Sequence, residues 1–161
     1  MAIHKLQFED FQEEDFSLIA IHSNEQDYRL AFSLNKYLKL KLKRTKLDVD
    51  FQYTNASFSL FEWYQLQQQT TWNLVSNNHK RDEEGVVSAG TLFDSSTSTI
   101  TKTYHLLDQF MNVNYLLKIA CETNSVNVQD VMESLIKIPE VLMAYQIQVD
   151  KINTKENLIF K

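Results

Sequence analysis

The sequence predicts a single α+β domain, in which a mostly antiparallel sheet of about six to eight strands carries two helices on one face. Three observations predict it. Two β-α-β units, at residues 16–53 and 115–150, flank short alternating segments that indicate a β-meander. The 43% hydrophobic content of 161 residues supplies a substantial core. With two glycines, one proline and no flexible linker, we expect one domain over residues 1–161 with ferredoxin-like elements.

The first unit opens with the apolar run Phe16–His22, which is typical of a buried central strand. A helix follows through Leu40, and Ser23 or Asn24 is placed to cap its N-terminus. Its predicted apolar stripe consists of Tyr28, Ala31, Leu34, Tyr37 and Leu38. Strict alternation of apolar and polar residues over 47–53 then predicts the second strand of the unit.

The region between the two units contains strand-like and turn-like segments. Residues 58–63 and 72–75 predict a hairpin, and the shift of the apolar phase at Phe61 predicts a β-bulge. The charged segment 77–85 lacks hydrophobic periodicity, so we expect a mobile or disordered loop there. Short apolar stretches predict further strands at 86–93 and 100–107.

The second unit begins with a strand at 115–121, in which Cys121 falls on the inward face. Asn124, Ser125 or Asn127 is placed to cap the helix that follows. The predicted apolar stripe of this helix consists of Val128, Val131, Met132, Leu135 and Ile136. Pro139 ends the helix, because it lacks an amide hydrogen and disfavours helical geometry at the preceding residue. Alternation over 145–150 predicts a strand with one solvated face.

The two ends of the chain differ in character. Residues 1–15 form an acidic lead-in with interleaved aromatic residues. Residues 151–161 form an apolar C-terminal tail, which we expect to be tied down on its own core or on a partner.

Hydropathy and net charge argue against two classes of partner, membranes and nucleic acids. No apolar run approaches the roughly 20 residues that span a bilayer, and the N-terminus does not resemble a signal peptide, so we expect a cytoplasmic protein without membrane contact. The net charge of -5 and the pI near 5.3 argue against non-specific binding to nucleic acid.

The motifs of most nucleotide enzymes and metalloproteins are missing. Two glycines do not build a phosphate-binding loop, and neither a nucleophile elbow nor paired metal-binding cysteines occur. The sequence therefore implies no cofactor and no metal site. Cys121 has no second cysteine to pair with, and its strand position favours a buried structural thiol.

Five residues remain candidates for ligand or partner contacts. His22 ends a central strand before a helix, where α/β proteins often bind ligands, although a structural role also fits. Asp27 and Arg29, near a helix start, are placed to meet an anionic ligand or to form an ordinary exposed pair. Trp63 and Trp72 lie on the predicted hairpin, where they supply either a binding surface or cross-strand packing.

A basic run at residues 36–46 is the candidate for nucleic-acid contact. It extends from the end of the first helix, and its members include Lys39, Lys41, Lys43 and Arg44. Such a run can grip RNA, with nearby aromatic residues as stacking surfaces. Lysines also favour helix C-termini and discourage pairing at sheet edges, which gives the run a purely structural explanation.

Three phrases of the sequence resemble a family of uncharacterised bacterial proteins named for an IPExxDY motif. They are FSLIAIHSNEQDYRLAFSLNKYLKLKLKR at 16–44, FEWYQLQQQTTWNLVSN at 61–77 and SLIKIPEVLMAY at 134–145. Ile138, Pro139 and Glu140 match the motif, whereas Met143 and Ala144 stand where the family has Asp and Tyr. The resemblance implies membership without an assigned activity or catalytic residues.

A second, local resemblance concerns small-molecule-binding modules. The phrases NYLLKI and IPEVLMAY are similar to those of ACT domains and of the effector domains of Lrp/AsnC regulators. The similarity covers about 36 residues and lacks the glycine of the regulators' ligand loops. It implies a ferredoxin-like local fold.

These observations favour a non-enzymatic cytoplasmic binding or protein-interaction module. Its partner is an unknown protein or a second copy of the chain. In the second case, two copies form a homodimer through sheet edges or through the apolar tail. One alternative is an RNA-associated protein that uses residues 36–46. A second alternative is a small-molecule-binding or enzymatic site near His22.

Overall fold

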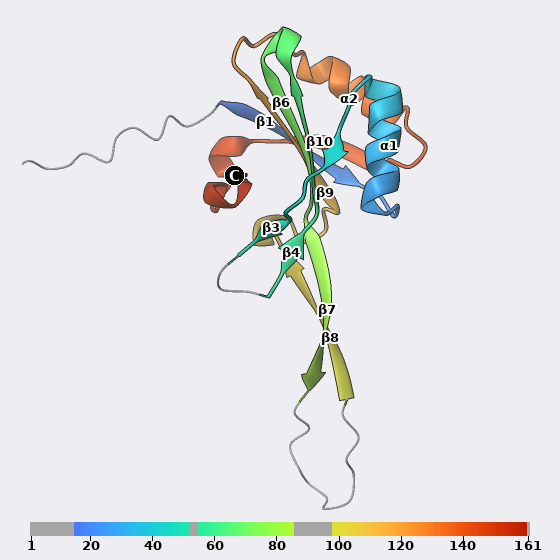
Figure 1. Cartoon of the computed structure of the whole chain (residues 1–161), viewed down its shortest axis with the longest axis vertical. Coiled ribbons are helices and arrows are strands. Elements are labelled where there is room, and N and C mark those ends of the chain that lie inside the picture. The colour runs from blue at the N-terminus through green and yellow to red at the C-terminus, as the bar shows by residue number, and fades with distance from the viewer. Residues whose placement is uncertain (1–14, 52–54, 86–97, 161) are drawn as a thin grey trace, which may run out of the picture.

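The fold is α+β, as the sequence predicts. The computed structural model describes residues 15–51, 55–85 and 98–160 (Figure 1). The main sheet consists of β1 (Phe16–His22), β2 (Lys43–Arg44), β5 (Leu60–Gln65), β6 (Thr70–Ser76), β9 (Tyr115–Cys121) and β10 (Met143–Ile147). Two-stranded sheets pair β3 (Val49–Asp50) with β4 (Ser57–Phe58), and β7 (Asn78–Gly85) with β8 (Ser98–His105). The helices are α1 (Asp27–Leu38) and α2 (Val128–Ile136).

The main sheet has the strand order β10-β1-β9-β6-β5-β2, and all neighbouring strands are antiparallel. Because β1 lies between β9 and β10, these two strands run parallel to each other, and α2 connects them across β1. The connection from β1 through α1 to β2 likewise joins two parallel strands and crosses β9, β6 and β5. The second predicted β-α-β unit is therefore present, whereas the first ends on β2 in place of the strand predicted at 47–53. In each case other strands lie between the two strands that the helix connects. The sheet has β10 at one edge and β2 at the other.

Helix α1 differs from its prediction in its cap and in part of its buried stripe. The N-cap is Gln26, whose side chain makes no capping hydrogen bond. The side chain of Ser23 accepts instead from the backbone N–H of Glu25 at 3.1 Å. Tyr28 and Tyr37 of the predicted stripe are exposed, and the buried positions are Leu30, Ala31, Ser33 and Leu34. The stripe is thus rotated on the helix relative to the prediction.

The long strand predicted at 47–53 is wrong. Strand β2 takes the sheet edge instead, and the chain then turns: the Thr45 hydroxyl donates to the Leu47 carbonyl at 2.7 Å, and Arg44 pairs with Asp48 at 2.5 Å. Only Val49–Asp50 forms a strand, in a separate sheet with β4. Leu47 is exposed. Residues 52–53, the end of the predicted strand, lie outside the described residues.

The predicted hairpin is present, but the β-bulge is wrong. Strands β5 and β6 pair without a break from Leu60 opposite Val75 to Gln65 opposite Thr70, and Trp63 lies opposite Trp72. The apparent phase shift at Phe61 arises because both faces of the sheet are covered there: Leu60 is buried on one face and Phe61 on the other. Consecutive apolar residues therefore need no bulge.

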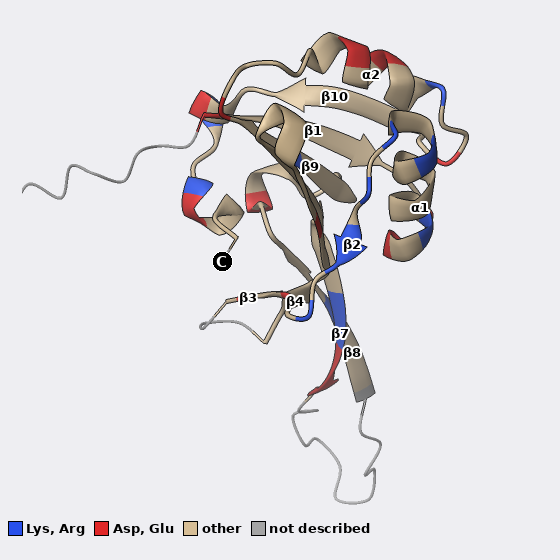
Figure 2. Ribbon diagram, turned by 45° about the horizontal axis from the view of Figure 1, so that its top comes forward, with Lys and Arg blue, Asp and Glu red and all other residues tan. Residues whose placement is uncertain are grey.

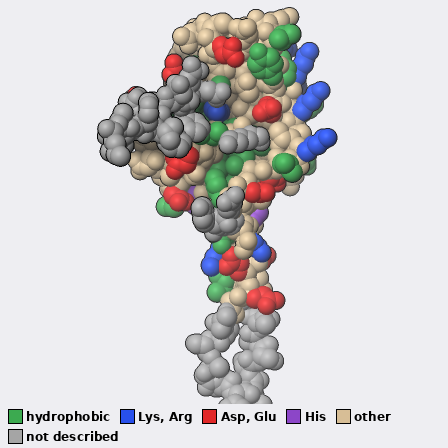
Figure 3. All heavy atoms as spheres, turned by 60° about the vertical axis from the view of Figure 1, so that its left-hand side comes forward, with side chains coloured by type: hydrophobic (Ala, Val, Ile, Leu, Met, Phe, Trp, Pro, Cys, Tyr) green, Lys and Arg blue, Asp and Glu red, His purple; other side chains and the backbone are tan. Residues whose placement is uncertain are grey.

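The loop predicted at 77–85 is wrong as well, because β7 and β8 form an extended two-stranded arm that projects from the body (Figure 1). Its strands are held by polar contacts: Lys102 pairs with Glu83 at 2.8 Å, and Thr101 donates to Asp82 at 2.6 Å. Charges of both signs cover the arm (Figure 3). Strand β8 fits the strand predicted at 100–107, whereas the strand predicted at 86–93 lies outside the described residues.

The second unit follows its prediction closely. Strand β9 has the predicted bounds, and the side chain of Asn127 caps α2 by accepting from the N–H of Gln129 at 3.0 Å. The helix ends before Pro139. Two details differ: Ile136 is exposed, and the last strand ends at Ile147, where a 3-10 turn replaces the predicted continuation.

The sheet is covered on both faces by separate apolar clusters. The helix-side core joins α1 and α2 to one face of the sheet and includes Ile19, Ile21, Leu30, Leu34, Leu74, Leu117, Val131 and Leu135. The opposite core includes Leu18, Ala20, Phe58, Val75, Leu106, Leu107, Leu116 and Leu158. Leu158 confirms that the C-terminal tail is tied down on its own core. The acidic lead-in, apart from Asp15, lies outside the described residues.

Candidate interaction surface

Strand β10 is an edge of the main sheet without charge or proline, two features that usually protect an edge. Its sequence, Met143–Ile147, contains no charged residue and no proline. Met143 is 53% exposed and Tyr145 is 37% exposed, and Leu142, immediately before the strand, is 65% exposed. Edge strands with free backbone groups and apolar side chains are templates for pairing with another chain.

The apolar surface continues from β10 toward α1. A hollow of 500 Å³ separates α1 from the loop that leads into β10, and its lining residues are Glu25, Tyr28, Arg29, Phe32, Ser33 and Glu140. Phe32 is 70% exposed, and Tyr28 is more than half exposed. We call these side chains, together with Leu142 just before β10 and Met143 on the sheet face away from the helices, the β10 surface. Exposed apolar groups gathered in this way mark interaction sites in monomeric proteins.

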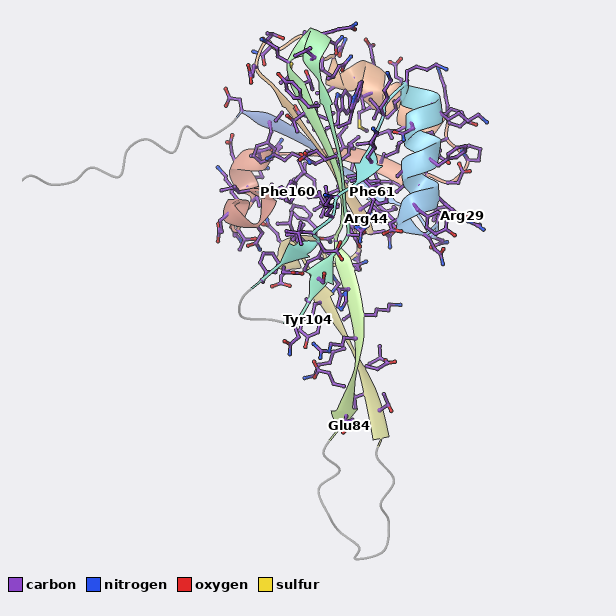
Figure 4. All side chains as sticks on the ribbon, viewed as in Figure 1. Arg29, Arg44, Phe61, Glu84, Tyr104 and Phe160 are labelled. Carbon is purple, nitrogen blue, oxygen red and sulfur yellow. The ribbon has the colours of Figure 1, made fainter. Side chains whose placement is uncertain are left out.

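The opposite edge of the sheet, β2, is protected by charge. Lys41, Lys43 and Arg44 are all exposed. Figure 2 shows the basic residues that follow α1 along this edge. The Arg44 guanidinium lies 5.6 Å from the centre of the Phe61 ring and also pairs with Asp48, as Figure 4 illustrates for Arg44 and Phe61. The RNA contact predicted for this run, Lys39 included, stays a prediction. Lys39 caps the C-terminus of α1 in a left-handed conformation with φ 59°.

His22 ends β1, on the sheet face away from the helices. Its ring lies 5.7 Å from that of Tyr145 on the neighbouring strand, and its Nε2 is buried without a hydrogen-bond partner among the described residues. A polar hollow of 300 Å³ opens just after it, with the lining residues Ser23, Asn24, Glu25, Ser76, Asn78, Lys80, Asn114 and Tyr115. His22 is not among them, so the structure does not join this imidazole to the polar groups of the hollow.

The phenol of Tyr115 closes one side of this polar hollow. It donates to the main-chain carbonyl of Glu25 at 2.5 Å. Burial, together with the nearby carboxylates of Asp27 and Glu25, raises the pKa of Tyr115 to about 12. The Tyr115 hydroxyl therefore stays protonated at neutral pH and acts as a structural hydrogen-bond donor.

In the part of the chain that the structure describes, Asp27 and Arg29 contact other residues and do not pair with each other. The Asp27 carboxylate accepts from the backbone N–H of Tyr28 at 2.7 Å, and Arg29 lies 3.6 Å from Glu25. The Arg29 side chain points away from the body (Figure 4) and lines the hollow of the β10 surface. Of the two residues, the structure thus brings Arg29 to the candidate surface.

The two tryptophans occupy different depths. Trp72 is 4% exposed inside the helix-side core, and its indole N–H donates to Gln65 at 3.3 Å. Trp63, directly opposite on β5, is partly buried and packs against the same core. Their cross-strand contact stabilises the hairpin.

Cys121 is partly exposed, so the predicted buried thiol is wrong. It sits at the end of β9 among hydroxyl groups: Thr70 donates to its sulfur at 3.1 Å, and Ser125 lies 3.4 Å away. Burial raises the pKa of the Cys121 thiol, but the hydrogen bonds of Ser125, Thr70 and Thr123 outweigh it and lower the pKa to about 6. Thr123 and Ser125 follow Cys121 closely in the sequence, but only the pairing of β6 with β9 brings Thr70 to the sulfur, and sequence reasoning missed the cluster.

Lys118 is a buried lysine on β9, to which the sequence pattern assigned no role. It is 5% exposed, and its ammonium lies 4.8 Å from the ring centre of Phe16 and 5.3 Å from that of Phe160. It also donates to the carbonyl of Leu158 at 3.0 Å. Aromatic faces and a carbonyl compensate in part for the lost hydration of the ammonium.

Comparisons with known proteins add no relative: no family model, no curated protein and no solved structure matches the chain. The resemblance to the IPExxDY family therefore stays a prediction. Among the described residues, no group of three His, Cys, Asp or Glu side chains is placed to hold a metal ion. Neither helix within the described ranges has the length and apolar character needed to cross a bilayer.

Proposed function

We propose that this chain is a non-enzymatic, cytoplasmic interaction module whose β10 edge accepts a strand from another polypeptide. One observation carries the proposal: β10 is an uncharged edge strand beside exposed apolar side chains, whereas the opposite edge, β2, is short and basic. A chain that protects one edge of its sheet and leaves the other open is suited to pairing at the open edge.

Strand addition at β10 has two sources of affinity. The free backbone N–H and C=O groups of Met143–Ile147 pair with those of the incoming strand, whatever its sequence. Leu142 and Met143 then lie beside the added strand and lose contact with water, which favours association by about 25 cal/mol per Å² of apolar area. Phe32 of α1, on the helix face of the sheet, offers a further exposed aromatic side chain, a residue type that often carries binding energy.

Photo-crosslinking in the native cell tests this function. A photoreactive amino acid replaces Gln146, which is exposed on β10, and a matched control places it at Gln67, which is exposed in the turn between β5 and β6. Captured adducts are identified by mass spectrometry. We expect adducts at position 146 and none above background at position 67, because only the first position lies at an open edge.

A surface variant supplies the second control. L142K/M143K places two charges beside β10, and charged side chains on an edge discourage pairing. We expect this variant to lose the adducts at position 146, while L47K/L66K, which changes two exposed leucines elsewhere, keeps them. Equal adduct yields at positions 146 and 67 in the native chain would count against strand addition at β10.

A further inference from the structure

The geometry points to a second copy of this chain as the polypeptide that β10 accepts. We infer that two β10 strands pair antiparallel about a twofold axis perpendicular to the sheet, with Tyr145 of one copy opposite Tyr145 of the other. This inference rests on the proposed function, because it names the partner for the same edge. The result is one continuous sheet of two sets of six strands, with all four helices on one face.

Symmetry restricts how the two strands align. In an antiparallel pair, side chains that lie directly opposite each other share one face of the sheet. A twofold axis perpendicular to the sheet therefore passes midway between one residue and the same residue of the second copy. Centring the pair on Tyr145 uses all five residues of β10, so that Met143 lies opposite the second copy's Ile147, and Ala144 lies opposite its Gln146. A centre at any other residue pairs fewer of them.

The side chains of β10 suit this self-pairing. Five uncharged residues place no like charges opposite each other, and the central position joins two aromatic rings, a pairing that stabilises sheets. Strand β2 lacks this property, because self-pairing there brings Lys43 and Arg44 of two copies together. Between the two edges of the sheet, only β10 is self-complementary in charge.

The available surface indicates a reversible dimer. Specific interfaces bury about 800 Å² per partner. An aromatic side chain buries about 150–250 Å² when fully covered, so Phe32 and Tyr28, which are 70% and 55% exposed, offer on the order of 100 Å² each. Together with the exposed parts of Leu142 and Met143, these side chains supply less area than a typical specific interface buries. We therefore expect a concentration-dependent equilibrium in place of a permanent dimer.

The net charge gives this dimer a characteristic salt response. Each copy carries a net charge of -5, so association brings like net charges together. Salt screens such repulsion over about 10 Å at 0.1 M. Because the pairing strands themselves are uncharged, added salt removes repulsion without weakening their contact. We expect the dimer to tighten as salt increases, which is the reverse of an association driven by opposite charges.

Light scattering and sedimentation over a range of concentrations test the inference on the full chain. We expect the mass to rise from 18.9 kDa toward twice that value, and L142K/M143K to raise the dissociation constant at least tenfold. The control L47K/L66K carries the same charges at exposed leucines away from β10 and should dimerise like the native chain. Circular dichroism verifies that both variants fold. A single 18.9 kDa species at every concentration and salt level overturns the inference.

A cysteine pair tests the register. In a chain with C121S, Y145C places two thiols opposite each other, with Cα atoms about 4.5–5.5 Å apart as antiparallel pairs have them, which is within disulfide range. We expect oxidation to yield a covalent dimer of Y145C/C121S and a monomer of the control Q67C/C121S. Equal dimer yields from both overturn the twofold arrangement. If position 146 forms adducts with other polypeptides while the chain stays monomeric, strand addition at β10 is supported. The second copy is then ruled out as the partner.

Discussion

The ammonium of Lys118, in the middle of the sheet, donates a hydrogen bond to the main-chain carbonyl of Leu158, 40 residues further along the chain. This contact joins the central strand β9 to the C-terminal tail. Phe160 lies over the same ammonium, so the tail is fixed by a charged anchor as well as by its apolar side chains. A lysine buried in this way is retained only where its charge has partners.

Lys118→Met tests the anchor. A hydrogen bond to a charged group contributes about 1.5–3 kcal/mol, so we expect the free energy of unfolding in urea to fall by about 1–3 kcal/mol. The tail should also become accessible to carboxypeptidase. Lys137→Met, at an exposed lysine, is the control. An unchanged or increased stability of Lys118→Met would show that the tail is held by its apolar contacts alone.

Asn77→Ala tests the root of the β7–β8 arm. The buried Asn77 side chain donates to the carbonyls of Phe110 and Val113 at 2.8 and 2.9 Å and accepts from the N–H of Leu107 at 2.9 Å. Removing it leaves several buried groups unpaired, at about 1–3 kcal/mol each. We expect a loss of at least about 2 kcal/mol in chemical denaturation. Asn24→Ala, at an exposed asparagine, should change stability by less than about 0.5 kcal/mol.

Cys121 should react as a thiolate at neutral pH. Its pKa of about 6 predicts that the rate of alkylation by iodoacetamide rises through pH 6 and levels off by pH 7. Ser125→Ala removes one hydroxyl donor and should move this midpoint upward. A midpoint near 9.0, the usual pKa of a cysteine thiol, would contradict the role of the hydroxyl cluster.

The same thiol links stability to pH. The pKa of Cys121 is lower in the folded chain than its usual value of 9.0, so its contribution to stability is present above pH 9 and is lost as pH falls toward 6. We expect the native chain to gain stability relative to Cys121→Ser as pH rises from 6 to 9, measured by urea unfolding at each pH. Parallel curves for the two chains would refute the linkage.

Charge at the β2 edge should prevent a second mode of association. Lys41→Val/Lys43→Val removes two exposed charges there, and we expect assemblies larger than a dimer, because a chain with two open edges adds copies without closing. Lys36→Val/Lys137→Val removes the same charge elsewhere and should leave the mass unchanged. Static light scattering at increasing concentration distinguishes the two, and equal masses would argue against edge protection by β2.

The second β-α-β unit was predictable because local signals decide it. Asn127 caps α2, Pro139 lies just beyond its end, and β9 is apolar except for Lys118, so its strand character can be recognised without knowledge of its neighbours. The strand predicted at 47–53 failed for the opposite reason. Its alternation is as clear, but the turn closed by Arg44 and Asp48 directs the chain out of the sheet, and only the tertiary structure shows that turn.

Strand β7 was missed because it has no buried stripe for periodicity to detect. Its partner β8 supplies hydrogen-bonding and charged groups in place of a core, such as Lys102, which lies opposite Arg81 and pairs diagonally with Glu83. The β10 surface could not be predicted from the sequence either. Tyr145 was predictable as a strand residue, but whether a strand lies at an edge depends on the order of all six strands.

The strand order also decides when the fold is completed during synthesis. β1 leaves the ribosome early, but its two neighbours in the sheet, β9 and β10, begin only at Tyr115 and Met143. At about 5–20 residues per second, the apolar strand Phe16–His22 waits on the order of ten seconds for them. During that time it depends on chaperones or on transient local contacts. Truncated nascent chains that end before β10 should therefore be the aggregation-prone form of this protein.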